Sequence, residues 1–252
     1  MKKLLAVATI LIVIGVVYST VEKRLQSNDP AGKADPSVAQ KFLTPPWPRA
    51  SDQAAAISKD LMATNYYVVL DGSGSMNETA CSGRQTKMEA AKDALAVFAQ
   101  SVPASANLGL QVFDDKGVRE WLPLDVGNRE QFVRLVRKAQ AAGGTPLRDS
   151  VDQAYAKLLD QGKKQLGYGE YHLVIVTDGE ASSGQDPTQA VNKLLGESPI
   201  ILHTIGFCID NHHSLNQAGR TLYRAADNPA ALGEGLAEVL AEAPKFTVST
   251  FK

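Results

Sequence analysis

Apolar and polar positions follow a periodic pattern over most of the chain. Short, nearly continuous apolar runs predict buried strands, and segments with apolar residues three or four positions apart predict helices. Strands are expected at residues 66–70, 108–113, 118–124, 171–177, 200–207 and 220–225. Helices are expected at residues 51–63, 87–102, 128–140, 145–159, 186–195 and 228–242. Strands that mostly alternate with helices predict an α/β fold with a doubly wound, mostly parallel, Rossmann-like sheet.

The N-terminal segment has a different pattern. Lys2 and Lys3 precede an uncharged, largely apolar run from Leu4 to Val21. As a helix, this run covers roughly 27 Å, which is just enough for a bilayer core. We expect residues 1–21 to be an uncleaved transmembrane signal-anchor, and a cleaved signal peptide is the alternative. Both interpretations place the remaining chain outside the cytoplasm. The expected location is therefore the cell inner membrane, as a single-pass protein whose domain faces the periplasm.

Residues 22–50 are rich in proline and poor in branched apolar residues, which predicts an extended linker rather than a folded domain. A plain spacer is favoured over a proline-rich ligand motif, although Trp47 has the option of folding back onto the domain. The folded domain is expected at residues 51–245, followed by a short tail at residues 246–252.

Composition narrows the possible partners. The 252 residues include 26 basic and 27 acidic side chains, for a net charge of −1, and 44% of them are hydrophobic. This balance is typical of a globular protein, and no basic stripe is visible. We therefore expect no nucleic-acid partner.

Oxygen-bearing side chains follow three of the predicted elements. Asp71, Ser73 and Ser75 alternate with glycines directly after the first strand, Asp178 ends the strand at 171–177, and Thr145 stands before a helix. Ligands of open α/β sheets bind beyond the carboxyl ends of the strands, so these side chains are expected at one rim. Five oxygen donors without cysteine or histidine suit a hard cation such as Mg²⁺, Mn²⁺ or Ca²⁺.

These segments, in this order, resemble the metal-ion-dependent adhesion site (MIDAS) of von Willebrand factor A (VWA) domains. The resemblance rests on Asp71-Gly-Ser-Gly-Ser-Met, on Thr145 in Gly-Gly-Thr-Pro-Leu and on Asp178 in Thr-Asp-Gly, and it covers roughly residues 64–243. It implies that Ser73, Ser75 and Thr145 are direct or switchable ligands of Mg²⁺ or a substitute, and that Asp71 and Asp178 act partly through water. It also implies protein binding rather than catalysis, in which a protein partner presents an Asp or Glu to the metal.

Two enzyme classes and a structural protein are the alternatives to this binding role. A Mg²⁺-dependent phosphatase or hydrolase on this type of fold would be expected to carry a motif like Asp-x-Asp-x-Thr. Here Ser73 and Ser75 stand at the corresponding positions, so the usual acid/base residue is missing. A serine hydrolase needs Gly-x-Ser-x-Gly, which the spacing around Ser73 does not give. A structural envelope protein with a vestigial site predicts no metal binding at all.

The chain departs from the family pattern in two segments, residues 77–85 and 208–219, which we expect to adjust the partner surface. Cys81 and Cys208 fall in these segments, and a disulfide is favoured over two separate thiols. His203 is expected to be a core histidine rather than a ligand. His212 and His213 are expected at the loop surface rather than in a soft metal site.

Overall fold

The computed structural model describes residues 46–49, 56–209 and 211–241. The expected signal-anchor at 1–21, most of the linker at 22–50 and the tail at 246–252 lie outside the described residues. Within the ranges that are described, no helix is both long and apolar enough to cross a membrane.

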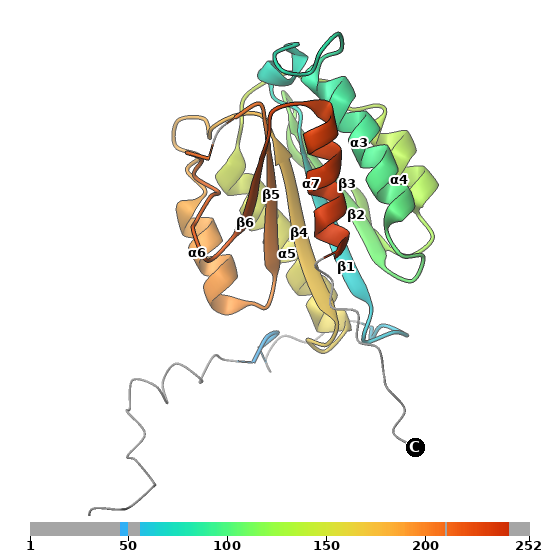
Figure 1. Cartoon of the computed structure of the whole chain (residues 1–252). Coiled ribbons are helices and arrows are strands. Elements are labelled where there is room, and N and C mark those ends of the chain that lie inside the picture. The colour runs from blue at the N-terminus through green and yellow to red at the C-terminus, as the bar shows by residue number, and fades with distance from the viewer. Residues whose placement is uncertain (1–45, 50–55, 210, 242–252) are drawn as a thin grey trace, which may run out of the picture. The chain divides into compact units, whose positions relative to one another are not determined.

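The core of the domain is one six-stranded sheet with the order β3-β2-β1-β4-β5-β6 (Figure 1). Its strands are β1 (Thr64–Asp71), β2 (Asn107–Asp114), β3 (Gly117–Asp125), β4 (Glu170–Thr177), β5 (Ile201–Phe207) and β6 (Leu222–Ala226). All neighbouring strands pair in parallel except β3, which joins β2 through a hairpin and runs antiparallel at one edge. The predicted doubly wound, mostly parallel α/β fold is confirmed.

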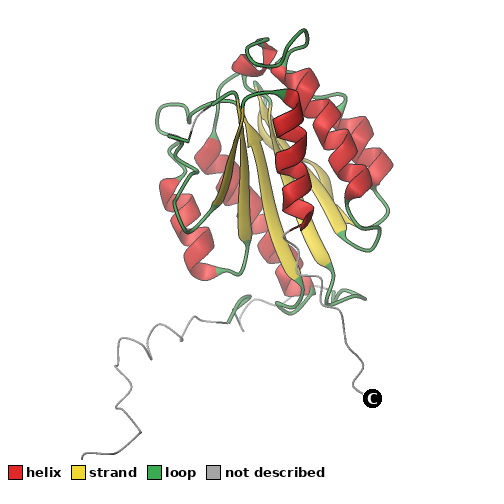
Figure 2. Ribbon diagram, in the orientation of Figure 1, coloured by secondary structure: helices red, strands yellow, loops and turns green. Residues whose placement is uncertain are grey.

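Helices cover both faces of this sheet (Figure 2). Helices α3 (Lys87–Ser101), α4 (Arg129–Val136) and α7 (Pro229–Ala241) pack on one face, and α5 (Leu147–Lys164) and α6 (Thr188–Glu197) pack on the other. Successive strand residues point to opposite faces, so in β1 Val68 packs under the first group and Val69 under the second. Each large apolar side chain buried in this way contributes about 1.5–3 kcal/mol to stability.

Tertiary hydrogen bonds override two of the helix predictions. The helix predicted at 51–63 is wrong for the described residues 56–63, because Ser58 donates to the carbonyl of Lys164 and Gln165 donates to the carbonyls of Leu61 and Ala63. The helix predicted at 128–140 ends at Val136. Six residues later the backbone amide of Ala142 donates to the carbonyl of Gly72, which ties this chain segment to the end of β1.

The last part of the linker packs on the domain. The Trp47 ring meets the Tyr171 ring edge-on, with centroids 4.7 Å apart. It lies so close to α5 that a β-carbon at Gly162 would stand 2.4 Å from the indole. Residues 46–49 are therefore more than a spacer, and the option that Trp47 folds back is confirmed.

Candidate functional site

The loop after β1 is shaped by its glycines and by contacts with β2. The amide of Gly72 donates to the carbonyl of Phe113 at 2.8 Å, and a β-carbon at Gly72 would stand 2.5 Å from that same oxygen. Only glycine fits this approach. The chain then enters a single 3₁₀ turn, η1 (Gly74–Asn77), which brings Ser73 and Ser75 to the carboxyl end of the sheet.

Four of the five predicted site residues form one hydrogen-bonded network. The hydroxyl oxygens of Ser73 and Ser75 are 3.0 Å apart, and the Ser75 hydroxyl donates to Oδ1 of Asp178 at 2.8 Å. Asp71 accepts from the Ser73 amide at 2.7 Å and from the Thr177 hydroxyl at 2.6 Å. The last contact ties the network to the end of β4.

Thr145 reaches the same place from a third loop. The carbonyl of Gly143 accepts from the amide of Gly74 at 3.0 Å, and the amide of Thr145 donates to the Ser182 hydroxyl at 2.9 Å. The hydroxyl oxygens of Thr145 and Ser75 each lie 3.8 Å from the point where a β-carbon of Gly179 would stand. The structure therefore brings all five predicted residues to one rim.

The two carboxylates of the site differ in their surroundings. Asp71 is fully buried, and loss of hydration raises its pKa to about 6, although its hydrogen bonds to Ser73 and Thr177 lower the pKa and oppose this rise. The second carboxylate, Asp178, is also buried, but its Oδ2 accepts from the Nζ of Lys87 at 2.8 Å. A buried cation thus balances one of the two acids.

Sequence reasoning missed Lys87. Its ammonium group also donates to Glu78 at 3.0 Å. Burial favours the neutral amine, but hydrogen bonds and charges from Asp178 and Glu78 outweigh it, so the pKa of Lys87 is raised. A signal was present, because Lys87 is the first residue of α3, where the helix dipole disfavours a cation. A local acidic partner offsets this unfavourable interaction with the dipole.

The donor set fits a small divalent cation. Mg²⁺ prefers octahedral coordination at about 2.0–2.1 Å, which places adjacent oxygen ligands roughly 2.8–3.0 Å apart. The separations Ser73 to Ser75 and Ser75 to Asp178, 3.0 and 2.8 Å, equal the edges of such an octahedron. Both oxygens of Asp71 are engaged by protein donors, which suits an indirect role. The hydroxyl-rich set favours Mg²⁺, Mn²⁺ or Ca²⁺ over softer metals.

The rim is enclosed by the two segments that depart from the family pattern. Cys81 and Cys208 form a disulfide with Cα atoms 6.0 Å apart, so the favoured pairing is confirmed. In the described part of 208–219 there is no helix, as expected. His213 is buried and lies 3.0 Å from the carbonyl of Gly179 through its Nε2, so its expected surface position is wrong.

The other histidines follow their expectations. His203 is buried in β5, with its Nε2 3.0 Å from Nδ1 of His172, as expected of a core histidine. His212 is exposed. Among the described residues, no group of three or more His, Cys, Asp or Glu side chains is arranged to hold a metal. The hydroxyl-rich rim is therefore the candidate site of this domain.

Comparison with known proteins agrees with this picture. Residues 66–180 match the family model described as von Willebrand factor type A domain. The uncharacterized protein YwmD of Bacillus subtilis (strain 168) is 28% identical over 165 residues, which cover 58% of this chain and 69% of that protein.

Two solved structures share the fold at low sequence identity. A von Willebrand factor type A protein from Catenulispora acidiphila superimposes with a TM-score of 0.58 and 21% identity, over 72% of this chain and 42% of that one. The pilus adhesin SpaC from Lactobacillus rhamnosus GG gives a TM-score of 0.58 and 15% identity, over 75% of this chain and 31% of that one. The sheet order, the three converging loops and the match over residues 66–180 support a domain of the von Willebrand factor A type in this chain.

Proposed function

We propose that this domain is a metal-dependent protein-binding module. Asp71, Ser73, Ser75, Thr145 and Asp178 would hold one Mg²⁺, or Mn²⁺ or Ca²⁺ in its place. A protein partner would supply an Asp or Glu side chain to the open side of the cation. The observation that carries this proposal is the Ser73, Ser75 and Asp178 oxygen set, whose spacing matches an octahedral edge.

The local charge balance supports capture of an anion. Asp71 and Asp178 are the two acids of the site, and Lys87 already neutralises part of their charge. A divalent cation held by three neutral hydroxyls therefore retains positive charge toward solvent. A carboxylate from another molecule fits this need, and the fold that the pilus adhesin SpaC shares with this chain is compatible with such a role.

Calorimetric titration of the full chain with Mg²⁺ and Mn²⁺ tests the metal site. One cation should bind per chain, and Ser73→Ala and Asp71→Ala should each lower the affinity at least tenfold. Ser101→Ala is the matched control, because this exposed serine lies at the end of α3 and its hydroxyl donates to the carbonyl of Val97. A wild-type chain that binds no divalent cation would favour the vestigial-site alternative.

The partner is tested by proximity labelling in cells with wild type and with Asp71→Ala, followed by pull-down with and without EDTA. Proteins that depend on the metal should be lost in both the variant and the chelated sample. A partner set that is unchanged by both treatments contradicts capture through the metal.

Catalysis is separated from binding by a phosphatase assay. Glu78 is the first acidic side chain after the serine loop, and it is already paired with Lys87. We therefore expect no Mg²⁺-dependent release of phosphate from a generic aryl phosphate. Turnover that requires Mg²⁺ and disappears in Asp71→Ala would establish the alternative, a phosphatase or hydrolase.

We further propose that residues 1–21 anchor the module in the inner membrane, with the domain in the periplasm. The apolar run of residues 4–21 and the disulfide between Cys81 and Cys208 support this location, since disulfides persist outside the cytoplasm. Protease added to spheroplasts should digest the domain. Full protection with intact membranes would refute the proposed orientation.

A further inference from the structure

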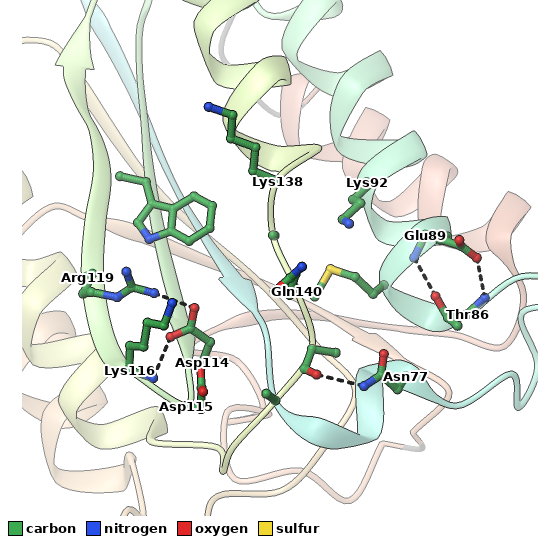
Figure 3. Close-up of a pocket in the computed structure, with 15 residues that line it drawn as sticks. Asn77, Thr86, Glu89, Lys92, Asp114, Asp115, Lys116, Arg119, Lys138 and Gln140 are labelled. Carbon is green, nitrogen blue, oxygen red and sulfur yellow. Dashed lines mark hydrogen bonds and ion pairs between the residues drawn. The ribbon is translucent and has the colours of Figure 1, made fainter.

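A groove of about 510 Å³ lies beside the candidate metal site (Figure 3). It is enclosed by three elements: the start of α3, the β2–β3 hairpin and the segment 138–142 that follows α4. Its lining reaches the metal-site loops on two sides, because Asn77 ends the 3₁₀ turn η1 and Ala142 bonds the backbone of Gly72. The side chain of Asn77 donates to the carbonyl of Ala141 at 2.8 Å and fixes these two sides together.

The acidic and basic side chains that line this groove differ in how they are paired. Among its acids, Asp114 forms an ion pair with Arg119, and Glu89 accepts a hydrogen bond from the neutral amide of Thr86 in a capping box. By contrast, no ion pair within the described residues involves Lys92, Lys116 or Lys138, which also line the groove. The lining therefore offers three lysines in reach of a ligand, against the exposed carboxylates of Glu89 and Asp115.

Two further features make the groove suited to a peptide. The guanidinium of Arg119 lies over the Trp121 ring at 5.5 Å, which gives the wall a flat surface of mixed apolar and cationic character. Lys92 is half-buried, and loss of hydration lowers its pKa. A negatively charged ligand would offset this unfavourable desolvation of the ammonium group. Figure 3 shows Lys92 on the α3 side and Lys116 and Arg119 on the hairpin side.

We infer that the groove binds an acidic peptide segment of the partner protein, next to the carboxylate that the metal site captures. This inference rests on the proposed function and names the chemistry of its partner: an Asp or Glu at the metal, followed within a few residues by at least two more acids. Charge complementarity with the three lysines and continuity with the metal-site loops carry the choice of an acidic peptide.

A random dodecapeptide display library, selected on the immobilised full chain in Mg²⁺ and eluted with EDTA, provides the probe. The selected peptides should contain several clustered acids, and fluorescence anisotropy should show affinities that weaken with salt. The double variant Lys92→Glu/Lys138→Glu should weaken binding about tenfold or more, with Mg²⁺ affinity unchanged. The matched control is Lys59→Glu/Lys164→Glu, two exposed lysines away from the groove, and it should stay within about twofold.

The outcomes separate the two proposals. A chain that binds Mg²⁺ but selects peptides without clustered acids contradicts the groove inference alone. Peptides that bind equally well to the Lys92→Glu/Lys138→Glu variant contradict it too. A chain that binds no Mg²⁺ in calorimetry overturns the proposed function, and the groove inference falls with it.

Discussion

The two ends of the central parallel strands bury polar groups in opposite ways. At the carboxyl end, Asp71 and Asp178 are buried acids, and Lys87 reaches in from α3 to pair with the second. Toward the amino end, His172 and His203 form a buried pair between neighbouring strands. Tyr66 stacks on His172 with ring centroids 4.8 Å apart. One end thus carries charge between loops, and the other carries neutral rings within the sheet.

This difference follows from how each group is held. Adjacent strands fix the histidines through the sheet register, and Glu170 at the start of β4 lies 3.7 Å from Nε2 of His172. The charged rim is assembled from loops that the sheet alone does not fix, and it requires additional ties. The disulfide and the Lys87 ion pairs supply those ties. The comparison therefore predicts that the carboxyl end is the more fragile, and that its failure is local.

Removal of the disulfide is expected to have the largest effect. Cys81 and Cys208 are 127 residues apart, and cross-links that close loops of this size stabilise proteins by about 4 kcal/mol. Both cysteines have positive φ angles, 48° and 63°, so their loops are held in a conformation that non-glycine residues disfavour. Cys81→Ser/Cys208→Ser should therefore lower the free energy of unfolding by roughly 4 kcal/mol, measured by urea titration.

Hydrogen exchange shows which segments of the chain lose stability when the disulfide is removed. In the double serine variant, amides of residues 78–86 and 211–221 should lose protection first, and the amides of β1 and β4 should exchange only on global unfolding. Wild type reduced with dithiothreitol should behave like the variant. An unchanged urea midpoint would mean that other contacts hold the rim without the disulfide.

The Lys87 ion pairs come next in size. Lys87→Met leaves the Asp178 carboxylate buried, with its side chain 0% exposed and Ser75 as its remaining donor. Breaking a buried pair by removing one partner costs about 3 kcal/mol or more. We expect such a loss in urea unfolding without divalent cation. Saturating Mg²⁺ should restore part of it, because a bound cation supplies the missing positive charge.

A second lysine provides the control for this prediction. Lys157 pairs with Glu120 at the same distance, 2.8 Å, but these side chains are 42% and 21% exposed. Lys157→Met should cost less than about 1 kcal/mol. The double variant Lys87→Met/Asp178→Asn should recover most of the lost stability. Equal losses for the two single lysine variants would contradict the view that Lys87 compensates a buried acid.

Sequence periodicity and strand ends were enough to predict the sheet and the meeting of the five site residues. Parallel strands end at one rim, so Asp71 and Asp178 meet whatever the details of the helices. Thr145 was expected at the same rim because it stands just before a helix, and its position depends on the segment that returns from α4. The positions of the site residues in the domain therefore follow largely from the strand pattern.

The missing features all depend on side chains or loops that cross between elements. Lys87 was taken only as the start of a helix, because periodicity does not reveal where a long side chain points. The pairing of Cys81 with Cys208 was favoured from the sequence and is confirmed, but the Cα separation of 6.0 Å that allows it is set by two irregular loops and has no signal in the periodicity. Helix α4 ends early because Ala142 bonds Gly72 across the domain, and no local signal marks that contact.

The amino end gives the smallest and most specific prediction. Burial lowers the pKa of His203 to about 3, and it also lowers the pKa of His172. In the unfolded chain His203 becomes protonated below about pH 6.5, whereas in the folded chain it becomes protonated only below about pH 3. The free energy of unfolding should therefore fall, by up to about 1.4 kcal/mol per pH unit for this histidine, as the pH drops through that window.

Urea titrations at pH 7 and pH 5 measure this slope. The variant His172→Gln/His203→Asn should lose less stability between the two pH values than wild type does, whatever its stability at pH 7. His212→Asn is the control, because His212 is an exposed histidine, and it should keep the wild-type slope. If the double variant keeps the wild-type slope as well, acid sensitivity does not arise at the amino end. The contrast between a neutral end and a charged end would then be wrong for the histidine pair.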